Sequence, residues 1–83
     1  MPKDTAVVTL NIEKRGLLEE IEIPLHITAN DLIIALNSAY QLGINTEDVF
    51  LCYLKSENPI ALLKGNKKLE EFGIRNGSLL IID

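Results

Sequence analysis

Few residues in this chain have side chains that could do chemistry, and they are widely spaced. The sequence holds a single cysteine, Cys52, and a single histidine, His26. A nucleophilic site needs a base and an orienting group beside the nucleophile, and this pair does not supply them. A metal site needs three or four converging ligands, and none is spaced for that around His26. We therefore interpret Cys52 as a structural or surface thiol and His26 as a partly exposed loop residue.

One basic cluster, Lys64, Lys67 and Lys68 around Gly65, stands out in the second half of the chain. It lacks the fixed order of glycines, lysine and hydroxyl residue that cradles a phosphate. We interpret it as a solvated loop.

Carboxylates gather at two places, first at Glu19, Glu20 and Glu22 and later at Glu70 and Glu71. No pocket accompanies them, so acid–base chemistry is not predicted. Such charges either attract a basic partner or keep an edge strand from pairing with another chain. The sequence therefore predicts no catalytic residue, no metal site and no cofactor, and we do not expect an enzyme.

The first third of the chain predicts a β-hairpin. Apolar residues alternate with polar ones over 6–12 and again over 17–25, which indicates two half-buried antiparallel strands. Gly16 ends the polar turn between them, where a positive φ is needed. Glu19 falls in phase with the apolar residues of its strand, and we expect it to reach water near the turn.

A helix is predicted over 29–42. Thr28 is placed to accept a hydrogen bond from the first turn, and Gly43 is placed to end the helix. The predicted buried stripe consists of Leu32, Leu36, Ala39 and Tyr40.

Three short apolar segments follow, and we predict them as strands over 49–54, 60–63 and 79–82. Residues 64–68 form a polar loop and 69–72 a brief helical turn. No repeat or linker divides the chain.

Length and composition allow one domain, which we place over 1–83 with 1–5 as a flexible N-terminus. The 83 residues carry a formal charge of −4, and 47% of them are hydrophobic, too many for a disordered segment. The excess of carboxylates disfavours nucleic acid as a partner, and the longest apolar run is far too short for membrane insertion. A single cysteine and the absence of an address signal favour the cytoplasm.

The order hairpin, helix and three short strands is that of the β-grasp fold. The pattern Leu69-x-x-x-Gly73-Ile74-x-x-Gly77-x-Leu79-Leu80-x-Ile82 resembles the final third of ubiquitin-like domains, and among these the chain most resembles the YukD/EsaB family. This resemblance implies an α+β ubiquitin-like fold, with a mixed four- to five-stranded sheet packed on one helix. It also implies a small cytoplasmic accessory component of the type VII (ESX-like) secretion systems of Gram-positive bacteria.

The final strand is followed by no Gly-Gly tail of the kind that ubiquitin-type modifiers and related sulfur carriers use. We therefore expect a non-conjugated module that binds other proteins, such as components of the secretion machine. Two alternatives stay open: a small non-catalytic subunit of a multicomponent enzyme such as a bacterial monooxygenase, and a modifier whose native gene extends past Asp83.

Alternation predicts which residues face the helix and which face outward. The residues expected to face the helix are Val8, Leu10, Ile12, Ile21, Ile23, Leu51, Leu80 and Ile82. The residues expected on the opposite face of the sheet are Val7, Phe50, Cys52, Leu79 and Ile81. An outward apolar patch of this kind usually marks a protein interface, and ubiquitin-like proteins commonly dock through this face. Self-association into a homodimer through the same face, or a register slip that exchanges the two faces, are the alternatives.

Overall fold

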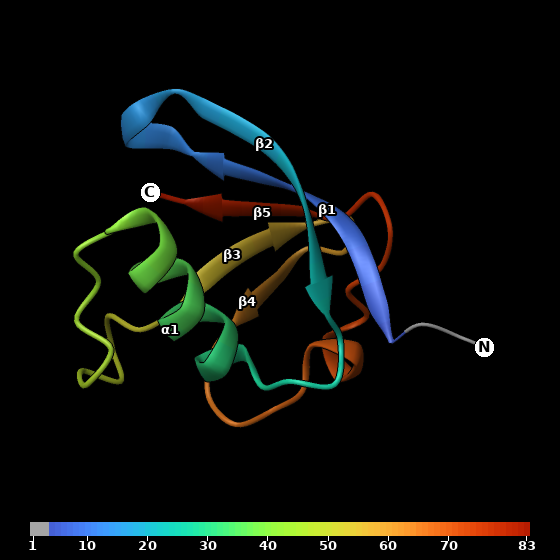
Figure 1. Cartoon of the computed structure of the whole chain (residues 1–83). Coiled ribbons are helices and arrows are strands. Elements are labelled where there is room, and N and C mark those ends of the chain that lie inside the picture. The colour runs from blue at the N-terminus through green and yellow to red at the C-terminus, as the bar shows by residue number, and fades with distance from the viewer. Residues whose placement is uncertain (1–3) are drawn as a thin grey trace.

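The structure, a computed structural model, describes residues 4–83, and these form a five-stranded sheet with one α-helix packed on it (Figure 1). The elements are β1 (Thr5–Ile12), β2 (Leu17–Pro24), α1 (Ala29–Tyr40), β3 (Leu54–Glu57), β4 (Ala61–Leu63) and β5 (Leu79–Ile82). The strand order is β2-β1-β5-β3-β4, with β1 and β5 parallel and the other pairs antiparallel. The predicted α+β β-grasp fold is confirmed.

No helix in the described part is long and apolar enough to cross a membrane.

The hairpin forms as predicted, with two antiparallel strands. β1 and β2 pair along their whole length, from Thr5 opposite Pro24 to Ile12 opposite Leu17. A 3₁₀ turn joins them, and Gly16 ends it with a φ of 59°. Of the predicted flexible N-terminus, residues 1–3 lie outside the described part, whereas Asp4 accepts a backbone hydrogen bond from Leu25 at 2.7 Å and Thr5 begins β1.

The helix begins as predicted but ends earlier. The Thr28 hydroxyl accepts a hydrogen bond from the Asp31 amide at 3.1 Å. The helix ends at Tyr40, because Gln41 adopts the left-handed conformation with a φ of 53°. The guanidinium of Arg15 donates to the carbonyls of Tyr40 and Gln41 at 2.5 and 2.8 Å. These donors satisfy carbonyls that the end of the helix leaves free. The residue with positive φ at this cap is Gln41 and not the predicted Gly43.

The buried stripe of α1 also differs from the prediction. It consists of Ala29, Leu32, Ile33 and Leu36, while Ala39 is exposed and Tyr40 is half-buried. The last helical turn is held by polar contacts with the hairpin, so the apolar stripe stops one turn early.

The third predicted strand, over 49–54, is wrong, because β3 begins only at Leu54. The Asp48 carboxylate accepts a hydrogen bond from the Phe50 amide at 2.9 Å, and the Asp48 carbonyl accepts from Leu51 and Cys52 at 3.0 and 2.9 Å. These local turns use amides that a strand would have paired with its neighbours.

The strand that does form there, Leu54–Glu57, is mostly polar in sequence. Its Ser56 is buried and donates to the Pro59 carbonyl at 2.8 Å, which satisfies the hydroxyl. The two later strands and the turn at Leu69–Phe72 form close to their predicted positions.

The core lies between α1 and the inner face of the sheet. Among the residues predicted to face the helix, Ile21 is half-buried, Leu51 is exposed, and the other six are buried. Leu69 and Ile74, two apolar residues of the pattern that resembles ubiquitin-like domains, are 0% and 3% exposed. Leu51 is exposed because it lies in the 48–52 turns and not in a strand.

Candidate protein-interaction surface

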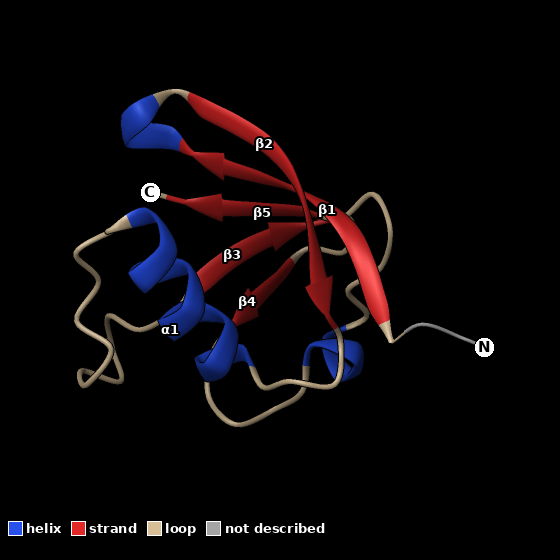
Figure 2. Ribbon diagram, viewed as in Figure 1, coloured by secondary structure: helices blue, strands red, loops and turns tan. Residues whose placement is uncertain are grey.

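The face of the sheet opposite α1 is crossed by no other element among residues 4–83 (Figure 2). Strand register shows which side chains lie on it, since partners across a ladder point to the same side. We call these residues the outer face: Val7, Thr9, Asn11, Leu18, Glu20, Glu22, Lys55, Glu57, Leu62, Leu79 and Ile81.

The outer face carries several accessible apolar side chains. Leu18, Leu62 and Val7 are 68%, 46% and 45% exposed, and Leu79 and Ile81 are half-buried. A hollow of about 410 Å³ lies beside Leu62 and Ile81. Its lining residues are Lys55, Ser56, Glu57, Ile60, Ala61, Leu62 and Ile81. The shape and chemistry suit an apolar side chain of a binding partner.

Three of the five residues predicted on this face, Val7, Leu79 and Ile81, lie on it. The prediction is wrong for the placement of Phe50 and Cys52. Phe50 belongs to the loop between α1 and β3 and is 84% exposed there. The error follows from the misplaced third strand, because alternation can assign a face only where a strand exists.

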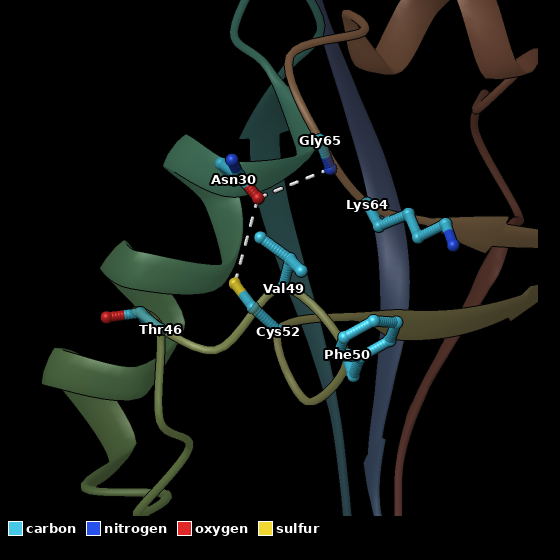
Figure 3. A pocket seen from close by; sticks show the side chains of 7 residues that line it. All are labelled: Asn30, Thr46, Val49, Phe50, Cys52, Lys64 and Gly65. Atoms are coloured by element: carbon cyan, nitrogen blue, oxygen red, sulfur yellow. Dashed lines mark hydrogen bonds between the residues drawn. The ribbon is translucent and has the colours of Figure 1, made fainter.

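Cys52 is buried between this loop and α1 and is 4% exposed. Its Sγ lies 3.7 Å from Asn30 Oδ1, which also accepts a hydrogen bond from the Gly65 amide at 3.2 Å (Figure 3). Burial raises the pKa of the Cys52 thiol, so the thiol stays protonated near neutral pH. A neutral, buried thiol is a poor nucleophile, and this environment fits the structural interpretation of Cys52.

The other candidate side chains do not converge on a reactive site. His26 is exposed, and so are Lys64 and Lys68. The ammonium of Lys67 lies 4.9 Å from the ring centroid of Phe72, a cation–π contact on the surface. Within residues 4–83, no group of three or more His, Cys, Asp or Glu is placed to hold a metal ion.

Two carboxylates on the strands have defined partners. Glu22 on the outer face accepts a hydrogen bond from the Thr5 hydroxyl at 2.7 Å. Glu19 lies in the inner register but is exposed, as expected, and accepts from the Tyr40 hydroxyl at 3.1 Å. The pKa of Tyr40 is raised, first by burial and then by this hydrogen bond.

At the other side of the outer face, the Lys55 ammonium lies 2.8 Å from the Asp83 carboxylate. The hydrogen bond between them raises the pKa of Lys55 and lowers that of Asp83, so both groups stay charged. The pair is exposed to solvent, where such contacts contribute little to stability.

The prediction missed Leu18 and Leu62. Leu18 lies next to the turn, opposite Asn11, where alternation alone would have found it. Leu62 pairs with Lys55. This pairing could not be predicted from the sequence, because the predicted third strand, over 49–54, ends before Lys55.

The sequence profile of one protein family, described as "WXG100 protein secretion system (Wss), protein YukD", matches residues 6–82. No curated protein sequence matches the chain.

Solved structures of ubiquitin-like domains are similar in fold. The ubiquitin-like domain of tubulin-binding cofactor B superposes with a TM-score of 0.74 at 16% identity, covering 96% of this chain and 89% of that one. The C-terminal ubiquitin-like domain of mouse tubulin-specific chaperone e gives 0.72 at 11% identity, covering 99% and 88%. The corresponding domain of yeast Ddi1 gives 0.67 at 20% identity, covering 98% and 90%. At these identities the likeness shows the ubiquitin-like fold alone.

Proposed function

The chain belongs to the YukD family of the WXG100 protein secretion system, and from this premise we propose that it is a non-conjugated accessory component of such a system. In this proposal it works in the cytoplasm as a ubiquitin-like docking module and catalyses no reaction. Its outer face binds a larger protein of the secretion machine.

One observation carries the proposal, namely the uncovered apolar outer face. Leu62 and Val7 are accessible, and Ile81 forms part of the wall of the hollow. An apolar patch of this kind, rimmed by polar residues, is typical of a protein-binding surface. The buried, protonated Cys52 is consistent with a role without catalysis.

Affinity capture from the native host tests the proposal. The tagged chain is compared with two variants, Ile81→Asp on the outer face and Phe50→Asp in the exposed loop. We expect the wild type and Phe50→Asp to capture the same secretion-machine proteins, with the bait at its unmodified mass. We expect Ile81→Asp to lose at least about 90% of that capture, because one central anchor contributes about 2 kcal/mol or more.

Three results would contradict the proposal. Equal capture by Ile81→Asp would remove the outer face from the interaction. A mass-shifted bait joined covalently to other chains would identify a modifier. Capture of the subunits of a multicomponent enzyme in place of secretion proteins would favour the enzyme-subunit alternative.

A further inference from the structure

The free charges of the outer face are acidic. Glu20 and Glu22 project from β2, which is an edge strand, and Glu57 projects from β3. All three side chains are exposed. They lie on the same side of the sheet as the apolar residues and opposite α1, so a molecule docked on this face meets them.

The one base on this face of the described strands already has an acidic partner. Lys55 is the one base in the outer-face register of the described strands, and its ammonium lies 2.8 Å from the Asp83 carboxylate. Arg75, in the loop before β5, donates to the neutral amide oxygen Asn58 Oδ1 at 2.8 Å and keeps its positive charge. Within residues 4–83, the strands of the face therefore offer a partner three carboxylates that have no basic partner, whereas their one base is paired with a carboxylate.

Carboxylates stand on both sides of the middle of the outer face. Between Glu57 and Glu20 lie Leu79 on β5 and Thr9 on β1. The Glu22 carboxylate is oriented by the Thr5 hydroxyl. The distance from β3, which carries Glu57, to β2 is three strand spacings, or about 14 Å. A helix lying across the strands covers that distance in about nine residues.

We propose that the outer face binds a segment of a partner protein that combines apolar side chains with Lys or Arg. The apolar side chains occupy the hollow, and the bases meet Glu20, Glu22 and Glu57. This inference rests on the proposed function and adds the chemistry of the partner. A second copy of the chain is disfavoured, because face-to-face pairing would set like charges against one another. Anionic lipid and nucleic acid are repelled for the same reason.

Selection from a displayed library of random peptides tests this chemistry without knowledge of the natural partner. Peptides of about 16 residues are long enough to cross the sheet as a helix. We expect the selected peptides to pair apolar residues with an excess of Lys and Arg over Asp and Glu. Binding of these peptides to the isotope-labelled chain should shift NMR signals of residues in β5, β3 and β2. The affinity of the peptides should fall at least tenfold when the salt concentration rises from about 50 to about 500 mM.

A matched pair of double variants isolates the role of charge. Glu20→Lys/Glu57→Lys reverses two charges on the outer face, while Glu47→Lys/Glu70→Lys makes the same change in net charge at exposed positions outside it. The first should weaken binding of the selected peptides at least tenfold, and the second should change it less than threefold. Circular dichroism and thermal melting establish that both variants are folded.

The outcomes separate this inference from the proposed function. One outcome is that the selected peptides bind the outer face but have no excess of Lys and Arg, and bind both double variants equally well. This outcome would contradict the inference that the partner segment is basic, but not the proposal that the outer face binds a protein. Peptides that shift only the 49–51 loop, or no binders at all, would contradict both. Dimerisation of the wild type through the outer face, seen by analytical ultracentrifugation, would show that the occupant is a second copy.

Discussion

Cys52 is the most reactive residue type in the chain, and its surroundings determine what it does. The thiol is enclosed by α1 and the loop at 48–52, with Asn30 Oδ1 as its polar neighbour. Burial disfavours the thiolate, which is the form that reacts with electrophiles and metals. The single cysteine is therefore a buried, neutral side chain at the junction between helix and loop.

A pH dependence follows from the raised pKa of Cys52. The folded chain holds the thiol proton more tightly than the unfolded chain does. The resulting contribution to stability is complete below the unfolded-state pKa and is lost as the pH rises through the higher folded-state pKa. Urea unfolding should therefore show a free energy of unfolding that falls from neutral to alkaline pH.

Tyr40 and Lys55 also have raised pKa values and contribute with the same sign, so a control is needed. Cys52→Ala removes the thiol and should make the decline with pH shallower than in the wild type. Identical pH profiles for the two proteins would contradict the assignment. Native Cys52 should also react with iodoacetamide at least about ten times more slowly than the urea-unfolded chain.

At the scale of elements, the contact of the hairpin with α1 decides where the helix ends. Arg15 lies in the turn between β1 and β2 and donates to the carbonyls of Tyr40 and Gln41. Asn37 holds the loop that follows the helix, since its side chain accepts from the amide of Ile44 at 2.9 Å and donates to the carbonyl of Ile44 at 3.0 Å.

Replacing Arg15 with Ala should lower the free energy of unfolding by about 1 to 2 kcal/mol, because two charged hydrogen bonds to the helix end are lost. Lys14→Ala, in the same turn, is the matched control and should stay within about 0.5 kcal/mol of the wild type. Urea unfolding measures both, and amide exchange should rise at the last turn of α1 only in the Arg15 variant. Equal effects of the two substitutions would show that the Arg15 contacts do not stabilise the helix end.

Elements with strong local signals could be predicted from the sequence. Alternation identified β1 and β2, the Thr28 cap located the start of α1, and Gly16 marked the turn. The end of α1 and the position of β3 depend on contacts between distant residues. Arg15 caps the helix from another element, and the polar segment at β3 becomes a strand because β4 and β5 pair with it.

The residues of the candidate surface could likewise be predicted only where a strand has a strong local signal. Val7, Leu79 and Ile81 could be placed on the outer face because their strands alternate clearly. The placement of Phe50 and Cys52 could not be right once β3 began later in the chain.

At the scale of the whole molecule, one face of the sheet serves stability and the other is available for binding. Its inner face holds the core against α1, and its outer face has no cover among residues 4–83 (Figure 1). Adjacent residues of β5 show this division, since Leu80 is 0% exposed in the core while Ile81 lies on the outer face beside the hollow. Stability and binding should therefore respond separately to changes at these two positions.

The most direct test of this division compares Leu80→Ala with Ile81→Asp in both urea unfolding and partner binding. Leu80→Ala should lower the free energy of unfolding by about 2 to 5 kcal/mol, as large-to-small core substitutions do, and should leave the binding of the folded chain unchanged. Ile81→Asp should change the free energy of unfolding by less than about 1 kcal/mol, because its side chain is partly solvated, and should abolish most of the binding. If Ile81→Asp unfolds the chain or binds as the wild type does, the outer face is not the docking surface.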